Sequence, residues 1–215
     1  VALAQQDLKK VELSEENAVP ILYRPFDTRY TFYTGRSKGI HCRPRFGNMQ
    51  NMLDGQNLGL ITARSNKSSN PDHFFVTRHI TEAKSGESTT QSCLFPLRRY
   101  SPGTDLFSGT DAGGSNVSIS VREQISKLLD RPWREDPGPD GPGVVTPEHL
   151  LAFTYAQLHT PLYRNRYGPF LKREYPRLFL PSTPKLFDDL VELGSELISL
   201  HLLEAATLDQ PITST

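Results

Sequence analysis

The pattern of apolar residues changes once along the chain, and this change constrains the fold more than any other feature. Up to about Tyr100 they form short runs, rich in β-branched and aromatic side chains and separated by turn residues, which is typical of strands. The last third instead repeats leucines at helical spacing behind two helix-start signals, Thr146-Pro147 and Thr183-Pro184. This order predicts an α+β fold, a twisted, largely antiparallel sheet region followed by a helical C-terminal part packed against it.

The sheet region is expected to contain five short strands, at residues 21–23, 30–33, 58–63, 74–77 and 92–97. Pro96 removes a ladder donor, so the last of them should end there or lie at a sheet edge. Short helices are expected over residues 45–53 and, at the polar N-terminus, 7–16. The Gly- and Ser-rich stretch 101–118 is predicted to be a loop.

Four units follow from these patterns. Residues 1–18 are interpreted as a connector from a preceding domain, because the chain opens on Val1 rather than Met. Residues 19–118 form the β-rich region, residues 119–205 the helical part, and residues 206–215 a frayed tail. Within the helical part, residues 120–130 are predicted to be helical, and the Pro- and Gly-rich stretch 132–147 to lack regular structure.

The C-terminal helices are predicted to bury three apolar faces. The faces comprise Leu151, Tyr155 and Leu158; Tyr163, Tyr167 and Phe170; and Leu186, Leu190, Leu193 and Leu197, widened by Phe187, Val191 and Ile198. Gly168-Pro169 interrupts the second face, so a kink or a new helix start is expected at Pro169.

Composition excludes several classes of protein. Hydrophobic residues make up 36% of the chain and charged residues 22%, as in a globular domain, and no apolar run is long enough to span a membrane. The two cysteines, Cys42 and Cys93, have no zinc-like spacing, which favours free thiols in a cytosolic protein. The net charge is zero, yet residues 19–100 carry twelve basic and five acidic side chains, a net of +7.

No motif for chemistry is present. The chain has no Asn/Asp-Pro-Pro-aromatic loop for methyl transfer to an amine, no Gly-rich cofactor turn after a strand and no phosphate-binding GxxxxGK[ST] loop. Neither a nucleophile–histidine pair nor a convincing nuclease motif stands out. We therefore expect no catalysis, no cofactor and no metal in this fragment.

Basic loops at strand ends are the candidate binding residues, because loops held by a rigid sheet often carry recognition. Arginine can bind phosphates or donate hydrogen bonds to both O6 and N7 of guanine, and asparagine can hydrogen-bond with adenine. The DNA-contacting candidates are Arg36, Lys38, His41, Arg43, Arg45, Arg64, Asn66, Lys67, Arg78, His79 and Lys84. An ordinary solvated surface is the alternative for each loop.

Two segments combine aromatic and basic residues, and each could either pack within the fold or contact nucleic acid. Tyr23, Phe26 and Tyr30 would stack on bases if exposed, but the alternation of a half-buried strand favours core packing, with Asp27 pairing Arg24 or Arg29. The segment 163–167 either packs through its tyrosines or contacts phosphates through its arginines.

Several ordered motifs resemble one known family. They are Tyr23-Arg24-Pro25-Phe26-Asp27, Arg43-Pro44-Arg45, Asn57-Leu58-Gly59-Leu60-Ile61, Phe74-Phe75-Val76-Thr77 with His79, Phe95-Pro96-Leu97 and the stretch from Leu158 to Arg177. Together they are similar to the C-terminal target-recognition (specificity) domain of Type ISP restriction–modification enzymes and adenine-N6 DNA methyltransferases.

The resemblance implies a prokaryotic, cytoplasmic module that recognises a sequence in double-stranded DNA and is not catalytic itself. It also implies a methyltransferase core in the same polypeptide, S-adenosylmethionine as the cofactor of the parent enzyme, and a target adenine presented for flipping. A structural docking module that couples methyltransferase to motor or nuclease parts is the alternative. No base-reading residue is implied by the resemblance, so the DNA contacts rest on position alone.

Overall fold

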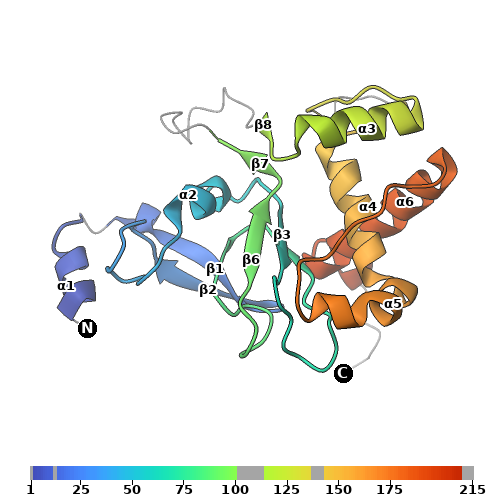
Figure 1. The fold of residues 1–215 in the computed structure, drawn as a ribbon. Coiled ribbons are helices and arrows are strands. Elements are labelled where there is room, and N and C mark those ends of the chain that lie inside the picture. The colour runs from blue at the N-terminus through green and yellow to red at the C-terminus, as the bar shows by residue number, and fades with distance from the viewer. Residues whose placement is uncertain (1, 12–13, 101–113, 137–142, 210–215) are drawn as a thin grey trace.

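The computed structural model describes residues 2–11, 14–100, 114–136 and 143–209. Strands predominate up to Arg99 and helices from Ile119, so the α+β prediction is confirmed (Figure 1). The strands are β1 (Ala18–Arg24), β2 (Asp27–Phe32), β3 (Gly59–Thr62), β4 (Phe75–Thr77), β5 (Ile80–Thr81), β6 (Cys93–Pro96), β7 (Arg98–Arg99) and β8 (Gly114–Ser115). The helices are α1 (Ala2–Leu8), α2 (Phe46–Met49), α3 (Ile119–Leu129), α4 (Pro147–His159), α5 (Pro161–Leu171) and α6 (Pro184–His201), with 3-10 turns at Glu15–Asn17, Gln50–Met52 and Ala206–Asp209.

The strands form three small sheets rather than one. The orders are β2-β1-β5, β4-β3-β6 and β7-β8, and every pairing is antiparallel except β1 with β5. Strand β6 lies at the edge of its sheet and ends at Pro96, as predicted. The first two sheets and α2 enclose one apolar cluster, which includes Ile21, Met52, Ile61 and Leu94.

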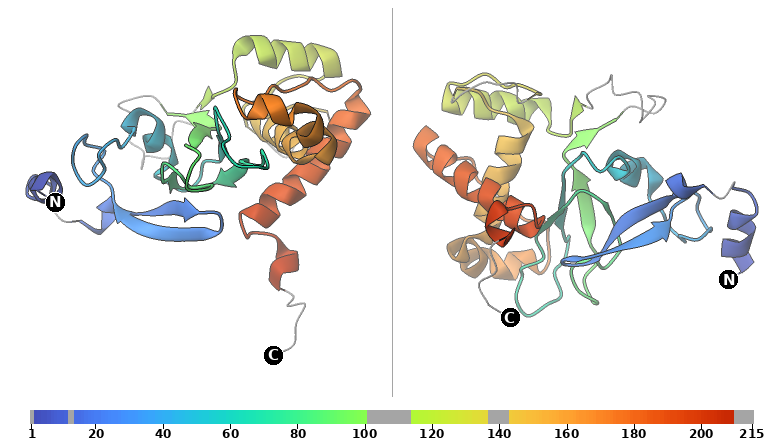
Figure 2. Two further views of the ribbon diagram at one scale, coloured as in Figure 1. Left: turned by 60° about the horizontal axis from the view of Figure 1, so that its bottom comes forward. Right: turned by 180° about the vertical axis from the view of Figure 1, so that it is seen from behind.

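The helical part packs against the opposite side of the β4-β3-β6 sheet (Figure 2). Val76 and Leu97 of the sheet region contact Tyr155 of α4 and Ile198 of α6. Both predicted helix starts are confirmed, because the side chains of Thr146 and Thr183 accept hydrogen bonds from backbone N–H groups in the first turns. The sheet that carries several of the basic loops therefore rests on a fixed helical base.

Helix α6 buries a face rotated from the predicted one. Phe187, Gly194 and Ile198 are buried, whereas Leu186 and Leu193 are 41% and 58% exposed. A glycine at the crossing point lets α6 approach α4 closely, and the apolar pattern does not contain that information.

Helix α5 also departs from expectation. It runs through Pro169 without a new start and ends two residues later, at Leu171, although the proline cannot donate the hydrogen bond that an N–H at this position would make to the Asn165 carbonyl. The chain turns instead at Thr160, between α4 and α5. Tyr163 is buried as predicted, but Phe170 is 64% exposed, and Leu171 takes the buried position.

Three predictions near loops and the N-terminus were wrong in part. The first helix spans Ala2–Leu8 instead of residues 7–16, and Asp7 in its last turn directs its carboxylate to the loop after β2. The stretch 132–147 contains a bridge between Trp133 and Val145, and Gly114–Ser115 forms a strand. Residues 101–113, 137–142 and 210–215 lie outside the described part of the chain.

The β1–β2 hairpin exposes aromatic side chains that the alternation assigned to the core. Phe26 is 59% exposed in the turn before β2, where its ring meets that of His201 edge to face at 5.9 Å, and Tyr30 is 79% exposed on the edge strand β2. The predicted ion pair is present between Asp27 and Arg29, and the Arg29 guanidinium also lies over the ring of Tyr23.

Candidate nucleic-acid interface

The segment after β2, residues 33–45, is an irregular loop that is tied down at both ends. The hydroxyl of buried Tyr33 donates to the carbonyl of Pro44 at 2.7 Å. The Asp7 carboxylate accepts from Thr34 Oγ1 at 2.7 Å and from the Ile40 amide at 3.2 Å. These bonds hold a surface loop in one conformation, which recognition of a fixed target requires.

Four basic side chains project from this loop, those of Arg36, Lys38, Arg43 and Arg45. All four are exposed, and none forms an ion pair with a described residue. Lys38 and Arg45 have left-handed backbone conformations, with φ of 60° and 51°, and Arg45 directly precedes α2. Non-glycine residues in this region are strained, and such strain is concentrated at functional sites.

A groove of about 650 Å³ runs beside this loop, and we call it the basic groove. Its lining includes the basic residues Arg43 and Arg45, the apolar residues Ile21 and Leu94, and Tyr175. His41 also faces the groove, bonds Thr31 Oγ1 at 3.0 Å, and has its pKa lowered by burial, so its ring is neutral at neutral pH.

A second basic loop, residues 64–70, follows β3 and packs on the end of α5. The backbone N–H of Asn66 donates to the Leu171 carbonyl at 3.1 Å, and Ser65 Oγ donates to the Lys172 carbonyl at 2.9 Å. The side chains of Arg64 and Lys67 are exposed and form no ion pair within the described residues. Arg64 lies near Tyr175, where its charge acts on the tyrosine hydroxyl together with that of Arg45, so this loop borders the groove.

The Asn66 side chain does not point into solvent as those of Arg64 and Lys67 do. Its side chain is 3% exposed, and Oδ1 accepts from the amide of Ser68 at 3.0 Å and from the hydroxyl of Ser68 at 2.8 Å. The predicted base contact by Asn66 therefore disagrees with its placement, because asparagines favour this local turn bond over projection into solvent.

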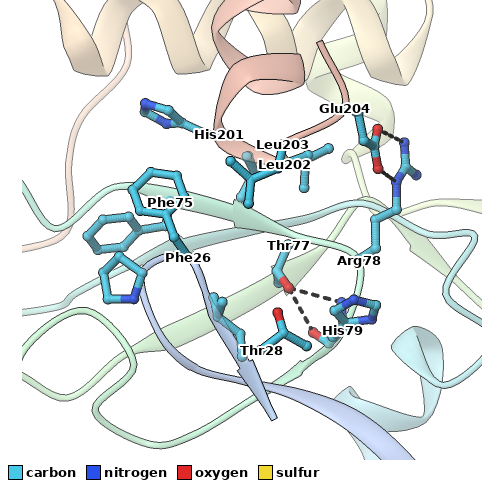
Figure 3. Close-up of a pocket in the computed structure, with 13 residues that line it drawn as sticks. Phe26, Thr28, Phe75, Thr77, Arg78, His79, His201, Leu202, Leu203 and Glu204 are labelled. Atoms are coloured by element: carbon cyan, nitrogen blue, oxygen red, sulfur yellow. Dashed lines mark hydrogen bonds and ion pairs between the residues drawn. The ribbon is translucent and has the colours of Figure 1, made fainter. Parts of the chain in front are cut away.

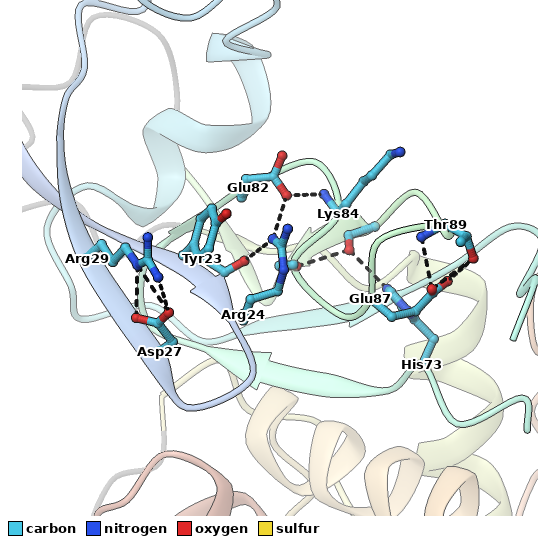
Figure 4. A network of polar contacts seen from close by, with 11 residues as sticks. Tyr23, Arg24, Asp27, Arg29, His73, Glu82, Lys84, Glu87 and Thr89 are labelled. Carbon is cyan, nitrogen blue, oxygen red and sulfur yellow. Dashed lines mark hydrogen bonds and ion pairs between the residues drawn. The ribbon is translucent and has the colours of Figure 1, made fainter.

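The third loop, residues 82–92, is held by its own acids (Figure 4). The Glu82 carboxylate accepts from Arg24 at 3.1 Å and from the Lys84 amide at 2.6 Å, which leaves the Lys84 ammonium exposed. A hydrogen bond from Thr90 lowers the pKa of Glu87 to about 2, and Thr90 Oγ1 also accepts from the Lys67 amide at 2.9 Å. The second and third loops thus support each other.

Arg78 and His79 lie elsewhere, beside the end of α6 (Figure 3). Arg78 is paired with Glu204 through two bonds of 2.6 and 2.9 Å, and the adjoining hollow is only about 100 Å³. The ring of His79 is half-buried, and burial lowers its pKa. The predicted DNA contact by these two residues disagrees with this placement, because Arg78 is already bonded to Glu204, just after α6, and the His79 ring is half-buried.

Some basic side chains of the sheet region are held in ion pairs within the fold, whereas others form no ion pair with a described acid and can meet a ligand. Of the twelve basic residues between positions 19 and 100, four form ion pairs with described acids: Arg24, Arg29, Arg78 and Arg98. The eight others form none with the residues that the structure describes: Arg36, Lys38, Arg43, Arg45, Arg64, Lys67, Lys84 and Arg99. Seven of these eight belong to the three loops, which leaves strong positive potential there in a chain of zero net charge.

Two aromatic residues of the site, Phe95 and Tyr175, were not predicted. Both are 42% exposed, their rings meet edge to face at 5.9 Å, and the Tyr175 hydroxyl donates to Cys93 Sγ at 3.2 Å. Strand alternation places Cys93 and Phe95 on one face of β6, opposite the buried Leu94. This alternation was the sequence feature that could have predicted an exposed Phe95. The contact with Tyr175 spans 80 positions and has no local signature.

The interface has the chemistry of anion binding, because exposed basic side chains surround one groove. Within the described ranges, no group of three or more His, Cys, Asp or Glu side chains is placed to hold a metal ion. No helix in these ranges is long and apolar enough to cross a membrane.

Asp7 connects α1 to the first basic loop, and this contact can be tested by pH. The hydrogen bond from Thr34 holds the pKa of Asp7 below its ordinary value of 3.8, so the contact contributes stability above that value and is lost as the pH falls below about 4. Asp7→Asn is expected to speed hydrogen exchange at the Ile40 amide at neutral pH and to leave the overall melting temperature nearly unchanged.

Gly39→Ala should have the same effect by another route, since a methyl group there would meet Asp7 Oδ2 at 1.9 Å. Glu123→Gln on the exposed surface of α3 is the control and should leave the exchange unchanged. Unaltered exchange at Ile40 in both Asp7→Asn and Gly39→Ala would show that the carboxylate does not hold the loop.

Comparison with known proteins gives the family. The model of the Type ISP C-terminal specificity domain matches residues 2–215. No curated protein sequence matches the chain.

Three solved structures share the fold. The DrdV–DNA complex is 22% identical with a TM-score of 0.64, covering 89% of this chain and 16% of that one. A nuclease-deletion mutant of LlaGI with a DNA substrate mimic is 18% identical, with a TM-score of 0.60 and coverage of 95% and 15%. LlaBIII bound to DNA is 17% identical, with a TM-score of 0.63 and coverage of 100% and 13%. The chain thus spans about one-seventh of these enzymes, and it belongs to the family of Type ISP C-terminal specificity domains.

Proposed function

We propose that this chain recognises a specific sequence in double-stranded DNA through the basic groove and the three loops around it. The observation that carries the proposal is the set of seven exposed cations on those loops that form no ion pair with a described residue. The nearby acids Glu82 and Glu87 are bonded to Arg24 and Thr89 instead. The similar solved structures, which are described as DNA complexes, support it. The proposed contacts are Arg36, Lys38, His41, Arg43, Arg45, Arg64, Lys67 and Lys84.

Different contacts serve different purposes in this proposal. Lysines and the outer arginines neutralise phosphates, which supplies affinity without sequence preference. Arg43 and Arg45 lie on the groove itself, where a guanidinium can bond both O6 and N7 of a guanine. Asn66, Arg78 and His79 are left out because their side chains are engaged in, or buried by, the fold.

The parent polypeptide is proposed to be an adenine-N6 DNA methyltransferase or restriction–modification enzyme. Its methyltransferase core would lie in the same polypeptide and bind S-adenosylmethionine, while this chain supplies recognition without catalysis. Such an enzyme works on DNA in the prokaryotic cytoplasm. The support is the family and the low coverage of the similar enzymes, whose remaining parts must contain their other activities.

A docking role is the second candidate, and one surface favours it. Ala156, Leu193 and Leu197 line an open apolar hollow of about 430 Å³ between α4 and α6. A surface of this kind suits another part of the same polypeptide. The two roles use different faces, so substitutions at the basic groove and at Leu193 distinguish them.

The proposed function is tested by the salt dependence of DNA binding. We expect the 215-residue chain to bind random duplex DNA weakly at low salt, with an affinity that falls steeply as salt rises. If five of the cations reach phosphates, the slope of log K against log salt is about −4.5. Fluorescence anisotropy at several salt concentrations measures it, and absence of binding at low salt or a flat salt dependence contradicts the proposal.

Arg45→Gly separates binding from stability. Glycine accepts the left-handed conformation without strain, so the variant is expected to be as stable as the native chain or more stable by up to about 1 kcal/mol. Its affinity for duplex DNA should nevertheless fall roughly ten-fold, because a groove contact is lost. Asp130→Gly is a matched control, since Asp130 has φ of 53° at the end of α3. It should stabilise without changing DNA affinity, and equal affinities of the two variants would exclude a role for Arg45.

A further inference from the structure

A second hollow adjoins the basic groove, and aromatic rings line most of it. We call it the aromatic pocket; it measures about 280 Å³. Its lining residues include Tyr163, Tyr167, Phe170, Tyr175 and Phe179. The sequence marks this part of the chain as aromatic and basic, and duplex recognition at the groove leaves it without a role.

The pocket is held open by hydrogen bonds on both of its walls. The Tyr163 hydroxyl donates to the Arg177 carbonyl at 2.8 Å, which fixes the segment after α5 across that helix. The Gln157 side chain accepts from the Phe179 amide at 2.9 Å and donates to the Phe179 carbonyl at 3.1 Å. The ring of Phe179 then lies 5.2 Å from that of Tyr167 with their planes inclined by 34°.

Tyr163 is buried and Tyr167 packs against the same core cluster, but the other three rings lie outside the core. Phe170 is 64%, Phe179 48% and Tyr175 42% exposed, although exposure of large aromatic side chains is unfavourable. Rings that are fixed in place by hydrogen bonds yet open to solvent are suited to stacking with another planar group.

The charge around the pocket indicates what kind of planar group it accepts. Residues 161–181 carry five basic side chains and one acidic one, so a cationic ligand is disfavoured and an anionic one favoured. The single acid, Glu174, is paired with Arg177 at 2.9 Å. Lys172 and Arg173, next to the pocket, are exposed and form no ion pair with a described residue.

Tyr175 lines both the aromatic pocket and the basic groove, so a strand leaving a duplex held in the groove reaches the pocket directly. We propose that the aromatic pocket binds an unpaired nucleobase of that strand, with its phosphates at Lys172 and Arg173. Enzymes that modify a base must take it out of the stack, so unpaired bases arise next to their recognition sites. This inference rests on the proposed function in one respect: the duplex bound in the basic groove determines where the unpaired strand begins.

The test compares three forms of one duplex: blunt, with a four-nucleotide overhang, and with the same overhang lacking its bases. The overhang contains 2-aminopurine, whose fluorescence falls on stacking. The native chain is expected to bind the overhang with bases roughly ten-fold more tightly than the abasic overhang. Equal affinity for these two forms overturns the inference, because phosphate contacts alone would then explain the binding.

Tyr167→Leu with Phe179→Leu keeps apolar volume and removes two stacking rings. The preference for bases over the abasic overhang should disappear, while affinity for the blunt duplex stays native; a preference that persists overturns the inference. Leu162→Ala, at an exposed apolar residue of α5 that does not line the pocket, is the control and should retain the preference. Should the double variant be misfolded by circular dichroism, Phe170→Ser replaces it, since that ring is largely exposed.

The two proposals fail in different ways. A native chain that binds the overhang through its bases but not the blunt duplex contradicts duplex recognition and leaves the aromatic pocket standing. A chain that binds the blunt duplex with no contribution from unpaired bases does the opposite.

Discussion

Reversing both groove arginines, Arg43→Glu with Arg45→Glu, is expected to lower the affinity for duplex DNA by roughly a hundred-fold or more. Each lost contact accounts for about 1–3 kcal/mol, and the new carboxylates repel phosphates. The slope of log K against log salt should also become less steep by about 2 if both side chains contact phosphates, and should change less if they read bases. Electrophoretic mobility shift at several salt concentrations measures both quantities.

The control for this variant must change the net charge equally. Lys127→Glu with Lys185→Glu does so on α3 and α6, away from the three loops, and both lysines are exposed. This control should keep most of the native affinity, because surface charges beyond about 10 Å are largely screened at 0.1 M salt. An equal loss in both double variants would mean that net charge, not the basic groove, determines binding.

Gly194→Ala is expected to destabilise the chain by about 3 kcal/mol, which corresponds to a fall in melting temperature of roughly 6–12 °C. A methyl group at this position would lie 2.0 Å from the carbonyl oxygen of Ala152, so α4 and α6 would have to separate. The gain in helix propensity, about 1 kcal/mol, is too small to compensate. Thermal unfolding followed by circular dichroism is the measurement.

Ser195→Ala is the matched control, on the adjacent exposed position of the same helix. It gains helix propensity without meeting α4, so its melting temperature should be equal to or slightly above the native value. A Gly194→Ala variant as stable as Ser195→Ala would show that the two helices do not cross closely at this glycine.

Local patterns predicted most of the elements of this fold. The side chains of Thr146 and Thr183 cap α4 and α6 as expected, since capping depends on a few adjacent residues. The orientation of α6 was not predictable in the same way. Leu186 and Leu193 belong to its apolar stripe, yet close approach at Gly194 buries the neighbouring face instead.

In the candidate site, too, local features were predictable from the sequence and features that depend on tertiary contacts were not. Arg43 and Arg45 were predicted from local composition, and the structure places both on one groove. Arg78 has the same local character, but its partner Glu204 is 126 positions away, and only the tertiary fold brings them together. Asn66 turns inward through bonds to Ser68, a local preference that competes with projection toward a ligand.

We propose that the basic loops of the sheet region read DNA sequence. The most direct measurement exchanges residues 19–118 between this chain and a family member of different specificity, and then selects the duplexes that each chimera binds from a random pool. We predict that the selected sequence follows the exchanged segment. A selected sequence that stays with the helical part, or no enriched sequence from any of the chains, would contradict the claim.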